Sequence, residues 1–144
     1  MLTIMDLIKS LLVKVLMKLS ECFIKKRNLK VVKNLPPWSE AEGCAEVQER
    51  EFDKFFNLVS DLGNPLRFDF AIFDNNKLIL LIEYDGEQHF KWLKGWQTKE
   101  EFEKLQYHDQ LKNTYCKNNN IPLLRIPYYD FDNIDDILCK YLKY

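Results

Sequence analysis

A chain of 144 residues is long enough to form one domain whose apolar core needs no disulfide bonds. Its residues are 47% hydrophobic and 14% aromatic, with only 4 glycines and 5 prolines, which excludes a disordered or low-complexity chain. The formal net charge of −1 gives no overall attraction for nucleic acid, so an anion-binding surface requires local clustering of the 21 lysines and arginines.

The cysteines show no pairing pattern. Cys22, Cys44, Cys116 and Cys139 include no Cys-x-x-Cys pair and no spacing typical of a metal site. We therefore expect reduced thiols, an intracellular, cytoplasmic location and no zinc site.

The N-terminal segment "MLTIMDLIKSLLVKVLMKLSECFIKK" is apolar but interrupted by charges at near-helical spacing. Its uncharged runs are far shorter than the roughly 20 residues of a membrane span. We expect an amphipathic helix that packs on the domain or on a second copy to form a homodimer; docking on a membrane surface or a partner is the alternative. Residues 28–45 include "NLPPWSEAEG", which is typical of a linker. The expected division is 1–45 for helix and linker and 46–144 for the domain.

A hairpin is predicted next. "LRFDFAIF" at 66–73 alternates in the period of a strand, with Asp69 in mid-strand, and "DNNK" suits a tight turn. "LILLI" at 78–82 is apolar on both faces, as in a central strand. Glu83 and Asp85 follow two residues apart, which puts them on one face, and Gly86 ends the strand.

The hairpin loop decides whether Asp69 and Glu83 meet. A loop with an odd number of residues brings the two carboxylates to one face, whereas a two-residue loop separates them. We expect convergence. Two carboxylates at such a short distance repel each other unless one is protonated or a cation bridges them. Because oxygen ligands favour Mg²⁺ or Mn²⁺ over zinc, we predict a site for one of these ions.

The C-terminal half predicts a helix, a strand and a closing helix. "TKEE" at 98–101 matches a capping box, and helical spacing continues to about Asn118. "IPLLRIPYY" at 121–129 reads as a buried strand and 133–142 as a helix, so a parallel crossover beside the hairpin is expected. Leu105, His108, Asp109 and Lys112 form one helical stripe, with polar groups where core residues would be usual.

Together, "LRFDFAIF…LILLIEYDGEQHF…HDQLKNTYC…IPLLRIPY" resembles the phage and viral branch of the PD-(D/E)xK nuclease superfamily, nearest to very-short-patch-repair-like and homing-type endonucleases. The resemblance covers about residues 64–142. It implies an α/β fold with a restriction-endonuclease-like three-layer core, in which helices flank a central mixed sheet. It also implies Mg²⁺-dependent hydrolysis of DNA, and, for a phage or viral protein, the host cell cytoplasm.

Carried over by position, the resemblance implies that Asp69 and Glu83 are metal ligands. Gln88 and His89 lie where such proteins place an activating or phosphate-contacting group. The superfamily's lysine two residues after the glutamate is Asp85 here. Either Lys112 replaces that lysine from the helix, or His89 transfers the proton while Asp85 joins the metal ligands.

Other site residues fit the motif less closely. Asp109 is an accessory candidate, with an ordinary helix ion pair to Lys112 as the alternative. A further carboxylate before the hairpin would be Glu42, with Glu40, Glu46 and Glu49 as equal choices. The candidate catalytic residues are therefore Asp69, Glu83, Asp85, His89 and Lys112.

Basic and aromatic side chains could contact nucleic acid. Besides Gln88, the candidates for phosphate contacts are Lys91, Lys94, Lys99, Lys104, Lys112 and Arg125. Trp92 and Trp96 either stack on bases or pack as a lid or core. Two function classes stay open: a metal-dependent endonuclease, and a catalytically inactive nuclease-fold module that binds nucleic acid or a protein. DNA is the expected substrate, and RNA is the alternative.

Overall fold

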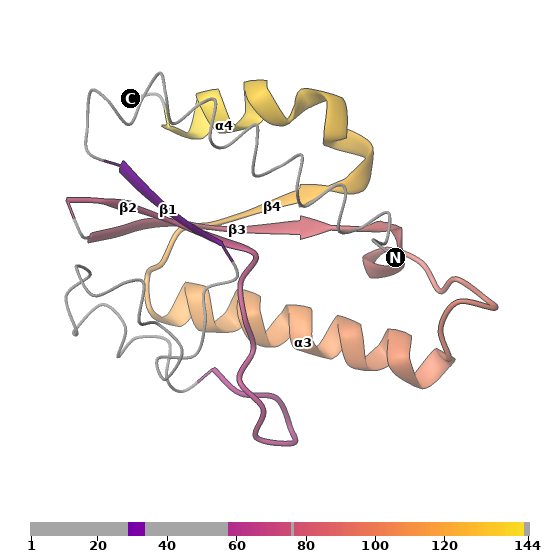
Figure 1. Cartoon of the computed structure of the whole chain (residues 1–144). Helices are drawn as coiled ribbons and strands as arrows, with labels where there is room; N and C mark the ends of the chain where they lie inside the picture. Colours follow the sequence, from indigo (N-terminus) through magenta and orange to yellow (C-terminus); the bar gives the residue numbers. More distant parts are fainter. Residues whose placement is uncertain (1–28, 34–57, 76, 143–144) are drawn as a thin grey trace.

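The computed structural model describes residues 29–33, 58–75 and 77–142 (Figure 1). The expected N-terminal helix, most of the expected linker and the accessory candidate Glu42 lie outside these ranges. Cys116 and Cys139, the cysteines within them, are both free thiols.

A four-stranded mixed sheet forms the middle of the fold. Its order is β1 (Leu29–Lys33), β2 (Phe70–Asp74), β3 (Lys77–Asp85) and β4 (Leu123–Pro127). The first three strands pair antiparallel, and β4 pairs parallel to β3. The predictions of a hairpin, a central strand and a parallel crossover are thereby confirmed.

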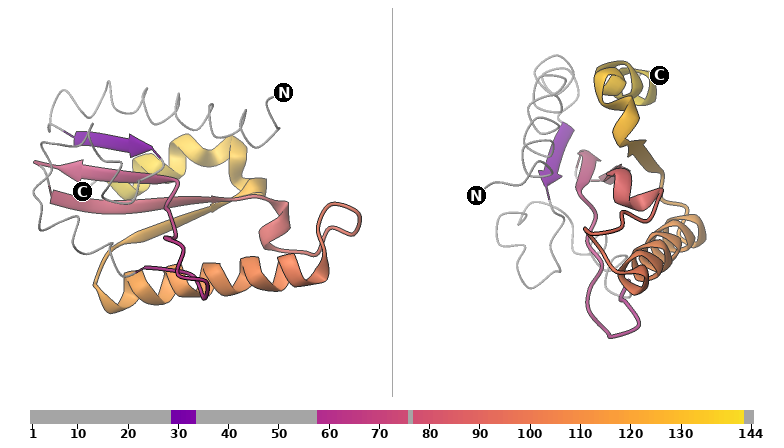
Figure 2. Two further views of the ribbon diagram at one scale, coloured as in Figure 1. Left: turned by 60° about the horizontal axis from the view of Figure 1, so that its bottom comes forward. Right: turned by 90° about the vertical axis from the view of Figure 1, so that its right-hand side faces the viewer.

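Two helices cover opposite faces of this sheet, so the fold is α/β with three layers (Figures 1 and 2). Helix α4 (Ile134–Leu142) shares a buried apolar cluster with Phe70, Ile72 and Ile82. Helix α3 (Lys99–Asn118) contributes to a second cluster that includes Ala71, Phe73 and Leu81. Two 3-10 turns, η4 (Glu87–His89) and η5 (Tyr128–Asn133), follow β3 and β4.

The predicted capping box begins α3. The Thr98 hydroxyl accepts a hydrogen bond from the Glu101 amide at 3.1 Å, and the Glu101 carboxylate accepts one from the Thr98 amide at 2.7 Å. The helix ends at Asn118, as expected. None of the helices in the described ranges is long and apolar enough to cross a lipid bilayer.

Strand β1 corrects the expected linker. Leu29–Lys33 pairs along its whole length with β2, so the sheet begins before residue 46. The stretch "LKVVK" holds three apolar residues, of which only two are adjacent. Too short to show a period, it becomes a strand through its pairing with β2.

The position of Asp69 was also predicted wrongly. Strand β2 begins at Phe70, so Asp69 precedes the strand. Leu66 instead donates its amide to the Leu58 carbonyl at 3.0 Å, in a separate loop. Phe68 packs in the same cluster as Ala71 and not with Phe70, because the alternation of faces breaks at Asp69.

Asp69 and Glu83 are brought together by a β-bulge rather than by an odd loop. Asp74 pairs directly with Lys77, so only two residues form the turn. Phe73 lies opposite Leu78 while Ile72 lies opposite Leu80, so Ile79 is an extra residue in β3. This shift restores the register that the two carboxylates need.

Candidate active site

The carboxylates of Asp69 and Glu83 each accept a backbone amide hydrogen bond across the point where β2 and β3 separate. The Asp69 amide donates to Glu83 Oε1 at 3.1 Å, and the Tyr84 amide donates to Asp69 Oδ2 at 2.9 Å. Phe70 pairs with Ile82, so the next step of the register sets Asp69 opposite Glu83. Each carboxylate thus takes the place of a backbone partner, and the expected convergence is confirmed.

Lys112 reaches this pair from α3. Its Nζ lies 2.7 Å from Glu83 Oε2 and 5.4 Å from the centre of the Phe68 ring. Glu83 is only 3% exposed. Burial raises the pKa of Glu83, and the charge of Asp69 adds to this rise, whereas Lys112 and Arg125 oppose it. The polar stripe of α3 therefore faces the sheet at Lys112, at the glutamate that the sequence singled out.

Asp85 has a different partner from the one expected. Arg125 in β4 donates from Nε and Nη2 to the two Asp85 oxygens, both at 2.6 Å. The same Nη2 donates to Asp109 Oδ1 at 2.7 Å, and Nη1 donates to Asn113 at 3.1 Å. Burial lowers the pKa of Arg125, but the bonds to Asp85 and Asp109 outweigh it and raise this pKa. Arg125, expected as a phosphate contact, is instead held among carboxylates, and Asp85 is paired with it.

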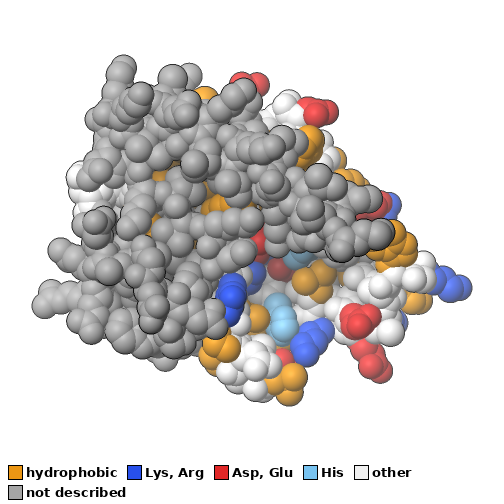
Figure 3. All heavy atoms as spheres, viewed as in Figure 1, with side chains coloured by type: hydrophobic (Ala, Val, Ile, Leu, Met, Phe, Trp, Pro, Cys, Tyr) orange, Lys and Arg blue, Asp and Glu red, His pale blue; other side chains and the backbone are white. Residues whose placement is uncertain are grey.

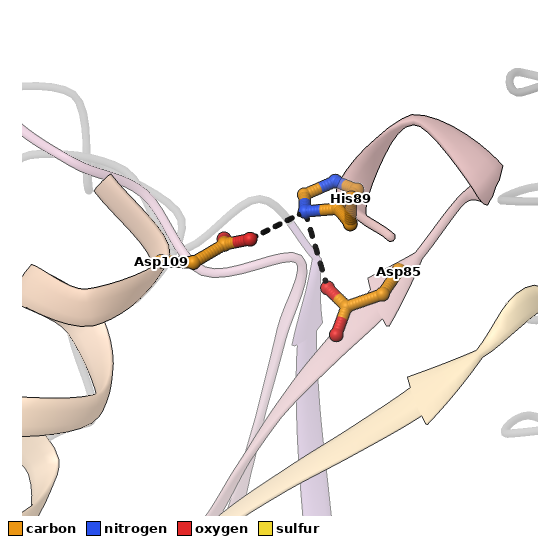
Figure 4. Close-up of side chains that lie close together, drawn as sticks. All are labelled: Asp85, His89 and Asp109. Atoms are coloured by element: carbon orange, nitrogen blue, oxygen red, sulfur yellow. Dashed lines mark hydrogen bonds and ion pairs between the residues drawn. The ribbon is translucent and has the colours of Figure 1, made fainter. Parts of the chain in front are cut away.

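His89 and Asp109 form a hydrogen-bonded pair between η4 and α3 (Figure 4). His89 Nδ1 lies 2.7 Å from Asp109 Oδ2 and 3.6 Å from Asp85 Oδ1. The short contact assigns a proton to Nδ1, and the other ring nitrogen points away from both carboxylates in Figure 4. Burial opposes ionisation of Asp109, but hydrogen bonds from His89 and Arg125 prevail and lower its pKa.

Asp85, His89 and Asp109 lie close together. One ligand atom from each of Asp85, His89 and Asp109 lies within 4.8 Å of the others. The sequence predicts that Asp85 lies with Asp69 and Glu83, but in the structure it lies with His89 and Asp109. The reason is the Arg125 guanidinium, which bonds to both Asp85 and Asp109.

Gln106, which the sequence analysis missed, helps to hold the η4 turn. Its side-chain amide donates to the His89 carbonyl. Gln106 and Asp109 are three residues apart on α3, so they contact the backbone and the ring of His89 from one helix face. The i,i+3 spacing could have pointed to Gln106, although the sequence does not reveal its partner.

Gln88 lies folded against Gly86. A Cβ atom at Gly86 would come within 2.4 Å of Gln88 Oε1, although the φ of −68° at Gly86 is open to any residue. The close atoms are all at the free end of the Gln88 side chain, so a larger residue at Gly86 would only have to displace that side chain.

The remaining candidates lie on the surface. Lys91 pairs with Glu87, Lys99 pairs with Glu103, and Lys94 and Lys104 are exposed. Trp96 is 85% exposed, so the alternative that it packs in the core is wrong. Trp92 donates its indole NH to the Gln97 carbonyl at 2.9 Å. His108 leaves the site and lies 3.7 Å from Asp61.

Among the described residues whose contacts form the site, carboxylates outnumber lysines and arginines. Four carboxylates, those of Asp69, Glu83, Asp85 and Asp109, face the two permanent cations Lys112 and Arg125. Figure 3 shows acidic, basic and histidine side chains gathered between β3 and α3. Clustered oxygen ligands with residual negative charge suit a hard divalent cation, so this donor set fits Mg²⁺ or Mn²⁺.

The fold and site define an α/β protein with a mixed sheet and a charged cluster where β3 and β4 end. A family model described as "Protein of unknown function (DUF2726)" matches residues 48–141, so the chain belongs to this family. It is also similar to "Uncharacterized protein 307L" of Invertebrate iridescent virus 6, with 43% identity over 74 residues. The match covers 51% of this chain and 32% of that relative, so it spans about a third of the viral protein. No solved structure matches the chain.

Proposed function

We propose that this chain is a metal-dependent endonuclease with a restriction-endonuclease-like fold, which hydrolyses DNA phosphodiester bonds. One observation carries the proposal: Asp69 and Glu83 meet at the separation of two strands, with Lys112 Nζ 2.7 Å from Glu83. Burying Glu83 beside a second carboxylate is energetically unfavourable, so a functional role would explain why the two lie together. Two acids and a lysine are also the groups that the resemblance requires, with the lysine supplied from a helix.

Asp69 and Glu83 are the proposed ligands of Mg²⁺ or Mn²⁺, whereas Asp85, the third ligand expected from the sequence, is paired with Arg125. A bound divalent ion supplies charge for the phosphate and a more acidic water. The excess of carboxylates over cations in the site supports this assignment.

His89 is the proposed proton-transfer group. Because Asp109 holds Nδ1, the outward ring nitrogen, Nε2, is the atom that would take up or release a proton. Asp109 would orient the ring and stabilise its charged form. Lys112 would stabilise negative charge on the phosphate. Gln88, Lys94 and Trp96, which follow β3, would contact the DNA next to the bond that is cut, whereas Lys91, also expected there, is paired with Glu87.

The second candidate is a module that binds nucleic acid or a protein without cutting. The ion pairs favour it, because Lys112 and Arg125 neutralise Glu83 and Asp85 as an ordinary buried ion pair would. An RNA substrate would use the same groups. The viral relative fits a location in a host cell as part of either proposal.

The test compares Asp69→Asn with Asp136→Asn, an exposed aspartate of α4. Purified chains are incubated with supercoiled and branched DNA in Mn²⁺, Mg²⁺ or EDTA, and products are followed on gels. We expect metal-dependent cleavage that Asp69→Asn abolishes and Asp136→Asn retains, because only Asp69 belongs to the site.

Calorimetric titration with Mn²⁺ separates the two candidates. Binding by the original chain that Glu83→Gln removes supports the endonuclease. Nucleic acid binding without Mn²⁺ binding or turnover supports the non-cleaving module. Equal cleavage by the original chain and Asp69→Asn would contradict the proposed site.

A further inference from the structure

Three aromatic rings gather on the surface beside the candidate active site. The aromatic platform consists of Phe90, Tyr128 and Tyr129. Ring centres lie 6.0 Å apart for Phe90 and Tyr128, 5.7 Å for Phe90 and Tyr129, and 5.4 Å for Tyr128 and Tyr129. Phe90 is 49% exposed and Tyr129 is 65% exposed. Large apolar rings in mutual contact at a surface are typical of binding sites.

The topology sets this platform next to His89. Phe90 directly follows η4, which ends at His89, and Tyr128 and Tyr129 open η5 directly after β4. Because β3 and β4 are parallel, the two turns leave the sheet at the same edge. Crevices at the carboxyl ends of parallel strands are common ligand sites in α/β folds.

Contacts with the domain core hold Tyr128 of the platform in place. Tyr128 packs against the buried cluster shared by the sheet and α4. Its carbonyl accepts a hydrogen bond from the Tyr84 hydroxyl at 3.5 Å. A ring ordered before binding loses little conformational entropy when a ligand stacks on it.

We propose that the aromatic platform stacks unpaired bases, so that the substrate has a single-stranded segment next to the bond that is cut. This inference rests on the proposed function. Every base offers a flat face to an aromatic ring, whereas an uninterrupted duplex keeps those faces within its own stack.

The charges around the platform favour contact with bases over contact with phosphates. Lys91 is paired with Glu87, and η5 carries Asp130 and Asp132 close to Tyr129 in sequence. A surface of mixed charge attracts a phosphate backbone weakly. Stacking therefore supplies the attraction at this edge.

The experiment measures binding in EDTA, where no metal-dependent cleavage occurs. Fluorescence anisotropy compares a labelled single-stranded oligonucleotide with its blunt duplex, for the original chain, Phe90→Leu and Tyr129→Leu. Tyr141→Leu is the matched control, since Tyr141 is 54% exposed near the far end of α4. Leucine keeps apolar bulk but removes the ring.

We expect the single strand to bind more tightly than the duplex. Phe90→Leu and Tyr129→Leu should each weaken single-strand binding by about fivefold or more, as expected for the loss of one stacked base. The slope of affinity against salt should not change, because no charge is removed. Tyr141→Leu should bind like the original chain.

Equal affinity for duplex and single strand, or full affinity in both platform variants, would overturn the inference. Altered self-association of these variants with unchanged oligonucleotide binding would assign the platform to protein contact and also overturn it. Thermal unfolding of Tyr129→Leu, whose side chain is largely exposed, checks that loss of binding is not loss of fold.

Cleavage in Mn²⁺ separates this inference from the proposed function. If single strands bind through the platform but no DNA is cut, the endonuclease proposal fails and the platform stands. If the original chain cuts an uninterrupted duplex as fast as a substrate with a single-stranded segment, and Tyr129→Leu cuts that second substrate at the same rate, the platform fails and the endonuclease stands.

Discussion

At the scale of single residues, the two-contact ion pair between Asp85 and Arg125 has the clearest energetic consequence. Both Asp85 oxygens accept hydrogen bonds from the guanidinium, and the carboxylate is 4% exposed. Removing one partner of a buried pair leaves an uncompensated charge, whereas replacing both partners restores an apolar contact. The loss of one partner should therefore lower the free energy of unfolding more than the loss of both.

We predict that Arg125→Leu lowers the free energy of unfolding by roughly 3 kcal/mol or more. Arg125→Lys should lose less, because it keeps the charge but not the forked geometry. The double variant Asp85→Leu/Arg125→Leu should recover part of the loss. Urea denaturation followed by circular dichroism measures all three. A single variant as stable as the original chain would show that this ion pair contributes nothing.

Asp109 gives a prediction about pH. Its pKa is lowered from the ordinary value of 3.8, so the folded state favours the ionised form. The resulting stability is fully present well above pH 3.8 and is lost as pH falls through the lower, folded pKa. The destabilisation caused by Asp109→Asn should therefore be largest near neutral pH and shrink below pH 3.8. Unfolding curves measured across this pH range test the prediction, with Asp136→Asn as the control. A stability difference between the original chain and Asp109→Asn that grows on acidification would contradict the prediction.

At the scale of elements, α3 supports the site from a well-defined first turn. Thr98 and Glu101 close the capping box, and Gln106, Asp109 and Lys112 follow on the side that meets His89 and Glu83. The beginning of the helix therefore sets the positions of three site contacts.

We predict that Thr98→Ala destabilises the chain by about 1 kcal/mol, the usual effect of losing such a cap. Glu101→Ala should cost more than Glu100→Ala. Both are acidic residues of the first turn, but only Glu101 accepts the Thr98 amide. Thermal unfolding of the three variants provides the comparison. Equal effects of the two glutamate substitutions would mean that helix-dipole charge, not the capping box, matters.

At the scale of the whole molecule, the elements that sequence predicted are those defined by local patterns. The capping box located α3, the run "LILLI" indicated a central strand, and the element order predicted the parallel crossover. These features depend on neighbouring residues, so a single sequence shows them.

The parts predicted wrongly depend on distant contacts. The bulge at Ile79 lies in a uniformly apolar run, where no residue differs enough to reveal the extra position. Arg125 looked like a free cation because its partner Asp85 is forty residues away along the chain. Asp69 lies outside the expected strand because it bonds to Glu83 and to the Tyr84 amide, which both belong to β3. Pairing, rather than composition, decided each case.

The amide hydrogen bonds that the Asp69 and Glu83 carboxylates accept also link the end of the hairpin to whatever occupies the site. Two backbone amides, those of Asp69 and Tyr84, depend on carboxylates that are the proposed ligands. A cation that drew either carboxylate away would release an amide, whereas one that used only the remaining lone pairs would leave both protected. The amides of Asp69 and Tyr84 therefore report on the site. The rate at which their protons exchange with solvent would distinguish a site that binds a cation without rearrangement from one in which these hydrogen bonds must first break.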